Sequence, residues 1–532
     1  MATLQFKGKA AVWNHHLSVP YHTLEKDAKK SLKGTDDAEN LIIEGDNLLA
    51  LKALLPQYQG RIKCIYIDPP YNTGNENWVY SDNVSSPMIK DWLGKTVGKE
   101  GEDLVRHDKW LCMMTPRLKL LRELLADDGV IFVSIDDNEA ARLKNLMDDV
   151  FGEECFMSSL VWTTKNAARG VPPTTMLMDN HEYVLCYSRV KDGVKFKGLP
   201  RDEEDFSNPD NDPRGLWRSE SIRATGGQKN FFAIKDPKTK MVFEGNWAFS
   251  KSKIEEMIAD GLILFPASED GTPRQKKFMD SYRNENKAFV SYLGWFSTEN
   301  ATKDFMELFD GEKLFDFPKP VELIRFLIEQ STNDGDIILD SFAGSGTTAQ
   351  AVVEVNGEKE RRKCILVQLP EEIKKDTPAY RAGFRWVHEL TVERIKRVLK
   401  GIKSKSGFSY YTLGPAIDAD ALLEGKLPKY NEFAKYVYYL ATGKNLADEK
   451  KIEEKAGFVG KAESESIWLL YKQDMDALKG LAITLDWAQE AHKKDKGRKV
   501  VYAPACYLDD ETLDQYNIKF VSIPYNLFER QS

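Results

Sequence analysis

The run Asp68-Pro69-Pro70-Tyr71 combines the residue types that methylation of the exocyclic amino group of adenine requires. That nitrogen is a poor nucleophile because its lone pair is delocalised into the ring. The Asp68 carboxylate and the Pro69 carbonyl could accept its two N–H groups, draw it toward tetrahedral geometry and receive the released proton. Tyr71 could stack on a base that has left its duplex. The structural alternative is a proline turn that closes a strand, with Tyr71 in the core.

A second candidate is the glycine turn Phe342-Ala343-Gly344-Ser345-Gly346. Glycines between a strand and a helix let the backbone approach a ligand and present helix N–H groups to it, which suits dinucleotides, nucleotides or S-adenosylmethionine. The turn lacks the third glycine of the dinucleotide fingerprint and the Gly-Lys-Ser/Thr ending of a phosphate loop. By itself it indicates a nucleotide-type site and a plain tight turn about equally.

Short, continuously apolar segments precede both runs and predict the strands that position them. Residues 62–67 lead into Asp68, where two prolines prevent the strand from continuing, and residues 336–340 lead into the glycine turn. Further apolar runs of this kind are 41–43, 130–135 and 364–369. Helical patterns alternate with these strands, which predicts a parallel sheet covered on both faces.

The alternation divides the chain into four expected segments. It holds over residues 1–155, fades over 156–300 and resumes over 301–405, and a further unit follows over 406–532. The middle segment predicts an inserted, strand-rich domain, except that residues 181–187 look like one more strand of the main sheet.

Composition limits the classes of function. The formal net charge of −8 argues against a protein that coats nucleic acid through bulk charge, so DNA contact must be local. The basic run from Arg394 to Lys405 is one candidate surface, with a solvated helix face as the equal alternative. The candidates in the insert are Arg169, Arg214, Arg218 and Arg223.

Apolar runs and cysteines suggest where the protein works. No apolar run approaches the roughly 20 residues that cross a bilayer, so we expect a cytoplasmic protein without a membrane partner. The 6 cysteines are far apart and lack metal-ligand spacing, so we expect reduced core thiols and no metal site.

The order of these motifs resembles the β-class amino-methyltransferases, and most closely the modification (Mod) subunits of type III restriction-modification systems. The resemblance covers roughly residues 40–190 and 310–400. It is carried by Gly45-Asp46, Asp68-Pro69-Pro70-Tyr71-Asn72, Asn180-His181-Glu182-Tyr183, Phe317-Pro318-Lys319-Pro320, and Arg362-Lys363 before Gln368-Leu369-Pro370-Glu371.

This resemblance implies an α/β fold, a circularly permuted Rossmann-like class I methyltransferase in which the catalytic half (1–155) precedes the cofactor half (301–405). The insert would be a target-recognition domain and 406–532 an accessory or oligomerisation domain.

The resemblance also implies a role for each matching residue. Asp68, Pro69, Pro70 and Tyr71 would direct methyl transfer to adenine N6 in double-stranded DNA, by base flipping and direct in-line attack. The residues expected around S-adenosylmethionine are Asp46, Lys319, Pro320, Asp340, Phe342, Gly344, Gly346, Thr347, Gln368 and Glu371. Many relatives carry an acid for the ribose hydroxyls at the position of Gln368, which makes Glu371 the substitute.

Alternatives remain open at this point. Amino methylation of cytosine at N4 has the same geometry and more often carries serine in place of Asp68. The chain could instead act mainly as the recognition subunit of a restriction complex whose nuclease and ATPase reside in another subunit, or as a solitary methyltransferase. A homodimer is implied by the resemblance alone.

Overall fold

The computed structural model describes residues 3–34, 40–73, 91, 94–97, 105–165, 176–226, 230–282, 286–357, 361–462 and 465–523. They divide into two compact units. The larger unit is formed by Met1–Phe196 together with Ser291–Ser532, and the smaller by Lys197–Val290.

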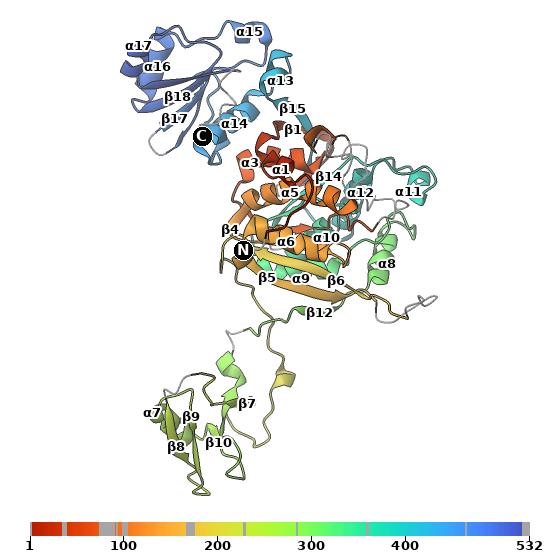
Figure 1. Ribbon diagram of the computed structural model, residues 1–532, viewed down its shortest axis with the longest axis vertical. Helices are drawn as coiled ribbons and strands as arrows, with labels where there is room; N and C mark the ends of the chain where they lie inside the picture. Colours follow the sequence, from red (N-terminus) through yellow and green to blue (C-terminus); the bar gives the residue numbers. More distant parts are fainter. Residues whose placement is uncertain are drawn as a thin grey trace. The chain divides into compact units, whose positions relative to one another are not determined.

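A mixed sheet of ten strands runs through the described part of the larger unit, in the order β1-β15-β2-β14-β13-β3-β4-β6-β5-β12. Its strands β5, β6 and β12 are labelled close together in Figure 1. Its central strands β2, β14, β13, β3 and β4 are parallel to one another, whereas β6 is antiparallel to both β4 and β5. The strands are β1 (Tyr21–Leu32), β2 (Leu41–Glu44), β3 (Ile62–Ile67), β4 (Leu125–Ile135), β5 (Phe156–Thr163), β6 (His181–Ser188), β12 (Tyr292–Trp295), β13 (Ile337–Asp340), β14 (Lys363–Gln368) and β15 (Phe408–Ile417).

Helices pack on both faces of this sheet. Successive residues of a strand point to opposite faces, and in β3 Ile65 joins the apolar core formed with α3, α5 and α6, whereas the Cys64 thiol meets Ser331 of α9. The main helices are α3 (Asn47–Tyr58), α5 (Arg106–Leu124), α6 (Ala140–Phe151), α9 (Val321–Ser331), α10 (Thr347–Asn356) and α12 (Val387–Gly401). Further helices are α1 (Lys9–Val12), α2 (His15–Ser18), α8 (Thr298–Leu308) and α11 (Pro378–Arg381). None of the helices in the described part of the chain is both long and apolar enough to span a bilayer.

The strand order is that of a Rossmann-type sheet with a permuted chain. With β13 taken as the first strand, β2-β14-β13-β3-β4 reproduces the 3-2-1-4-5 arrangement of a doubly wound sheet. Strands β2, β3 and β4, at the third, fourth and fifth positions, come first in the chain. Strands β13 and β14, at the first and second positions, come after them. The expected circularly permuted α/β fold is therefore confirmed. The order reverses between β13 and β3, where such sheets bind ligands beyond the carboxyl ends of their strands.

The smaller unit is narrower than the expected insert of 156–300. Strands β5 and β6 pair with each other in the main sheet, and β12 pairs with β5. Two antiparallel strands need no crossover helix between them. The loss of helical pattern after Cys155 therefore reflects antiparallel core strands, and the separate unit begins only at Lys197.

In its described residues, the smaller unit contains a three-stranded sheet, a two-stranded ribbon and one α-helix. The elements are β7 (Trp217–Ser221), β10 (Ile263–Leu264), β11 (Arg274–Phe278), the ribbon of β8 (Phe231–Lys235) and β9 (Val242–Asn246), and α7 (Lys251–Ala259). Ile222, Trp247 and Ile254 form the centre of its core.

The last segment also begins later than the expected residue 406, because β15 belongs to the main sheet, between β1 and β2. Beyond it lies a second sheet in the order β16-β17-β18-β19, in which β17, β18 and β19 are parallel. Its elements are β16 (Phe458–Ala462), β17 (Glu465–Leu469), β18 (Arg498–Ala503), β19 (Ile518–Ser522), α13 (Ala419–Leu423), α14 (Tyr430–Thr442), α15 (Met475–Lys479), α16 (Leu485–Lys494) and α17 (Asp510–Gln515).

Candidate active site

A pocket of about 560 Å³ lies beyond the carboxyl ends of β3 and β13, where the strand order reverses. Asp68 directly follows β3 and Asp340 is the last residue of β13. The sequence-predicted residues that line this pocket are Asp68, Pro69, Pro70, Tyr71, Lys319, Asp340, Phe342, Gly344 and Thr347. The fold therefore brings the proline run and the glycine turn, far apart in the chain, into one cavity.

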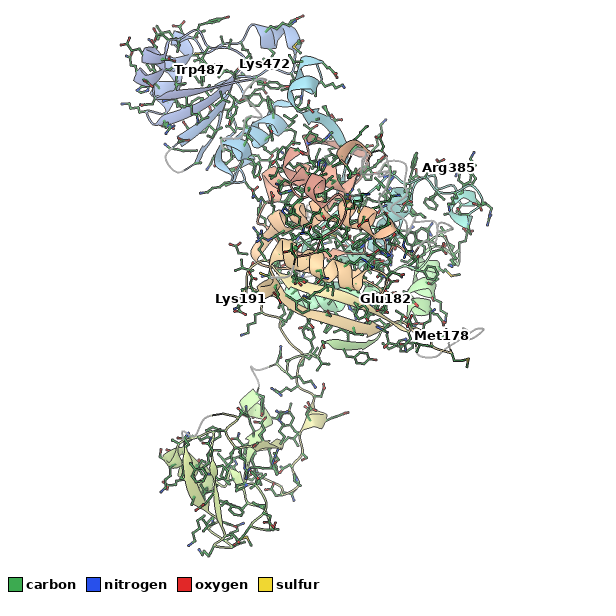
Figure 2. All side chains as sticks on the ribbon, in the orientation of Figure 1. Met178, Glu182, Lys191, Arg385, Lys472 and Trp487 are labelled. Atoms are coloured by element: carbon green, nitrogen blue, oxygen red, sulfur yellow. The ribbon has the colours of Figure 1, made fainter. Side chains whose placement is uncertain are left out.

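Four side chains form a connected polar cluster in this pocket. The Lys319 ammonium donates to the Tyr71 hydroxyl at 2.6 Å and to Glu182 Oε2 at 2.8 Å. The Tyr71 hydroxyl donates to the same Glu182 oxygen at 2.9 Å. Asp68 Oδ1 lies 3.5 Å from Lys319 Nζ. Glu182 lies on β6 and is labelled in Figure 2.

The surroundings of Asp68 make its carboxyl a weaker acid than usual. Its side chain keeps 30% of its surface exposed, and protein atoms enclose the rest. This burial raises the pKa of Asp68 from 3.8 to about 6, with a further upward contribution from Glu182, while the positive charge of Lys319 opposes the rise. Asp68 is therefore ionised at neutral pH, but closer to titration than an exposed aspartate.

The loop that follows β3 is held by buried polar contacts. The indole N–H of Trp110 donates to the Pro70 carbonyl at 2.6 Å. Asn72 is buried with a left-handed φ of 60°, a conformation that asparagine tolerates better than most residues. Its side-chain amide donates to Glu139 Oε1 at 2.6 Å. These contacts fix the backbone on both sides of Tyr71.

The glycine turn after β13 is held by side chains from two other elements. Gly344 and Gly346 have φ values of 50° and 83°, in the left-handed region that favours glycine. The Gly344 N–H donates to Gln368 Oε1 at 2.6 Å, and the Thr391 hydroxyl donates to the Gly344 carbonyl at 2.6 Å. A Cβ added at Gly346 would lie 3.1 Å from Thr391 Cγ2, a tight approach that adds to the preference for glycine set by the left-handed φ.

Asp340 is a buried carboxylate that organises the start of this turn. It accepts from the Phe342 N–H at 2.9 Å and from the Thr348 hydroxyl at 2.5 Å. Burial nevertheless dominates and raises the pKa of Asp340 to about 7.

Several residues expected at the cofactor do not line the pocket. Asp46 caps α3 by accepting from the Leu48 and Leu49 N–H groups. Pro320 and Gly346 are the N-cap residues of α9 and α10. Gln368 is 1% exposed and engaged with the glycine turn. Glu371 follows β14, and its carbonyl accepts from the Val387 N–H. A contact of these residues with a cofactor stays a prediction.

The predicted DNA-contacting arginines differ in their surroundings. Arg169 lies outside the described residues. Arg214 pairs with Asp212 at 2.8 Å and Arg218 pairs with Glu220 at 2.5 Å, so both are engaged inside the smaller unit. Arg223 is exposed.

The basic run that begins at Arg394 is not a uniform solvated face. Arg394 is 1% exposed and donates to the Ser345 hydroxyl at 2.7 Å and to the Thr347 hydroxyl at 2.8 Å. Arg397 pairs with Glu393 and Asp310. Arg394 therefore stabilises the glycine turn through buried hydrogen bonds to Ser345 and Thr347.

Sequence reasoning missed Glu182, Trp110, Thr391 and Arg394 as residues of the site. Glu182 stood inside a quoted motif, but only as part of a strand. The others lie on helices, where a buried Trp, Thr or Arg looks like an ordinary member of an amphipathic pattern. Their roles become visible only once the helices are packed against the two loops.

Comparison with known proteins agrees with this arrangement. A family model described as DNA methylase matches residues 62–377, which include both loops. The chain belongs to the DNA methylase family. This membership confirms the resemblance to amino-methyltransferases stated from the motifs.

Curated relatives of this DNA methylase include Mod subunits. The type III restriction-modification enzyme StyLTI Mod subunit of Salmonella typhimurium is 32% identical over 406 residues, covering 72% of this chain and 61% of that protein. The EcoPI Mod subunit of Escherichia phage P1 is 32% identical over 412 residues, covering 68% and 62%. The type II methyltransferase M.KpnI of Klebsiella pneumoniae is 32% identical over 398 residues, covering 70% and 90%. The match thus spans less than two thirds of the two Mod subunits.

Proposed function

We propose that this DNA methylase transfers a methyl group from S-adenosylmethionine to the N6 amino group of adenine in double-stranded DNA. One observation carries the proposal: the Asp68-Pro69-Pro70-Tyr71 run and the glycine turn line the same pocket at the switch point of the sheet. The first can bind an amino group and the second can bind a nucleoside-like cofactor.

The glycine-turn side of the pocket suits S-adenosylmethionine. Gly344 offers backbone without a side chain, and Phe315 and Phe342 offer aromatic surface. Asp316 lines the same side, and a carboxylate together with aromatic rings favours a cationic ligand. When bound, S-adenosylmethionine supplies an electrophilic methyl group, and its sulfur keeps the electron pair of the broken C–S bond.

The residues of the Asp68 side have distinct tasks in the proposed reaction. Asp68 accepts one N–H of the target amine and takes up the proton that the nitrogen must lose once it carries the methyl group. The Pro70 carbonyl is engaged by Trp110, so the Pro69 carbonyl is the acceptor expected for the second N–H. The Tyr71 ring stacks on the flipped base, and its hydroxyl is already anchored.

The biological setting is part of the proposal. Similarity to two Mod subunits supports a role beside a restriction subunit, whereas similarity to M.KpnI supports methylation without one. The unit Lys197–Val290 is the proposed target-recognition domain, and a homodimer is the proposed assembly. Sedimentation of the purified chain, alone and with a candidate restriction subunit, tests both partners.

The deciding experiment labels DNA. Purified protein is incubated with tritiated S-adenosylmethionine and unmethylated bacterial DNA, and the digested nucleosides are separated. We expect label on N6-methyldeoxyadenosine in the wild type, its loss in Asp68→Ala, and wild-type labelling in Asp510→Asn, a variant at an exposed carboxylate on α17. Label on cytosine would move the function to N4 methylation. Absence of label from DNA in the wild type would overturn the proposal.

A further inference from the structure

The structure points to a role for Glu182, which the proposed mechanism does not use. We infer that Glu182 is a positioning residue: one of its oxygens anchors both the Lys319 ammonium and the Tyr71 hydroxyl, so that the ammonium is not paired with Asp68 alone and the Tyr71 ring keeps one orientation. This inference rests on the proposed methyl transfer to an amino group and names the residue that organises its acceptor side.

The geometry is that of a shared counter-charge. Lys319 Nζ is 2.8 Å from Glu182 Oε2 and 3.5 Å from Asp68 Oδ1, so the ammonium lies between two carboxylates and closer to Glu182. The Lys319 and Glu182 side chains are 13% and 19% exposed, which limits screening by water. Without Glu182, the ammonium would pair with Asp68 alone and compete with the incoming amine for that carboxylate.

Tyr71 depends on the same anchor. Its hydroxyl donates to Glu182 and accepts from Lys319, and these two hydrogen bonds restrict the side-chain torsions of Tyr71. A ring that stacks on a flipped base gains affinity when its orientation is fixed beforehand, because less conformational freedom is lost on binding. Glu182 thus contributes to both the acceptor and the stacking surface while lying on a different strand, β6.

The charged and titratable groups around Asp68 set the sign of the expected effect. They are Lys319 before α9, Glu182 on β6, Tyr71 on the same loop, Tyr66 on β3 and Asp340 on β13. Within this set, Lys319 lowers the pKa of Asp68 and Glu182 raises it. Removing the charge of Glu182 must therefore lower the pKa of Asp68, whereas removing the charge of Lys319 must raise it.

The test compares pH profiles of methyl transfer under single-turnover conditions. Glu182→Gln keeps the shape and the hydrogen-bonding oxygen but removes the charge. We expect the acidic limb of its profile, the part in which the rate rises with pH, to move to lower pH by roughly one unit. We expect its maximal rate to fall about tenfold, because Asp68 pairs more tightly with Lys319 and becomes a weaker base. Lys319→Met should move the acidic limb to higher pH. Glu312→Gln, at an exposed position, is the matched control and should follow the wild type.

Two further readouts separate the explanations. Binding of S-adenosylmethionine by Glu182→Gln, measured by calorimetry, should stay within about twofold of the wild type, which also shows that the variant folds. Failure of the proposed function would appear in the wild type, as no label on DNA. If the wild type methylates DNA and Glu182→Gln shows the same pH profile and rate, or if both variants shift the limb in the same direction, the inference is wrong and the proposed function stands.

Discussion

The side-chain oxygen of Gln368, at the end of β14, accepts a hydrogen bond of 2.6 Å from the backbone N–H of Gly344. This bond joins β14 to the glycine turn that follows β13. The Gln368 side chain therefore shapes the glycine turn.

Replacement of Gln368 should therefore weaken cofactor binding by disordering the turn. We expect Gln368→Ala to raise the dissociation constant for S-adenosylmethionine about five- to tenfold, in line with the loss of one buried hydrogen bond. Gln368→Glu keeps an acceptor for the Gly344 N–H and should bind within about threefold of the wild type. Calorimetric titration measures both. Equal binding by the alanine variant and the wild type would contradict this role.

Activity should depend on the ionisation of Asp68. Because burial raises the pKa of Asp68 to about 6, the carboxylate form is lost as pH falls through that value. We expect the single-turnover rate to rise with pH through about 6 and then level off. Asp68→Asn should lower the plateau by at least about a hundredfold and remove this limb. A pH-independent wild-type rate between about pH 5 and pH 8 would exclude Asp68 as the proton acceptor.

Asp340 should make the protein less stable as pH rises. Its pKa is raised by burial from 3.8 to about 7, so the folded protein keeps a proton that the unfolded chain has already released at intermediate pH. This contribution to stability is complete below the unfolded value and is lost as pH rises through about 7. We expect the free energy of unfolding of the wild type, relative to Asp340→Asn, to fall between about pH 4 and pH 8. Urea denaturation at both pH values measures the difference; a constant difference would contradict the raised pKa.

Arg394 should be a stability residue, in contrast to its neighbour on the same helix. Arg394→Met removes buried hydrogen bonds to Ser345 and Thr347, and we expect it to lower the free energy of unfolding by about 2 kcal/mol. Arg397→Met breaks pairs that are partly exposed and should cost less than about 1 kcal/mol. Chemical denaturation measures the free energy of unfolding of both variants. An equal or larger loss in Arg397→Met than in Arg394→Met would contradict the buried role of Arg394.

Two arginines of the smaller unit should separate DNA contact from local structure. Arg223 is exposed, and we expect Arg223→Ala to weaken DNA binding. The slope of the logarithm of the binding constant against the logarithm of the salt concentration should become shallower by about one, as for the loss of one phosphate contact. Arg214 is held by Asp212, so Arg214→Ala should mainly lower the melting temperature. Fluorescence anisotropy at several salt concentrations, beside thermal unfolding, distinguishes the two effects.

The sequence predicted the parts of the site that short motifs encode. The strand before Asp68 and the glycine turn could be inferred because continuous apolar runs, prolines and glycines constrain the backbone locally. The permuted order was implied by the resemblance to the amino-methyltransferases. The insert was expected to begin at residue 156 because β5 is not followed by a helical pattern, although it pairs with β6 in the main sheet. Residues 181–187 were expected in the main sheet, where β6 pairs with β4. The contacts of Glu182, Trp110 and Arg394 depend on packing between distant elements, for which no local pattern exists.

The position of β2 has a consequence for synthesis of the chain. Both of its neighbours in the sheet, β14 and β15, are encoded after the smaller unit, whereas β3, β4, β5 and β6 are neighbours in the sheet that are all encoded before it. A nascent chain therefore carries β2 with two open edges while the ribosome completes most of the protein. Unpaired strand edges promote association between chains. Truncation before β15 should thus yield aggregates rather than a smaller enzyme, and expression at a slower rate or with chaperones should favour the full-length product.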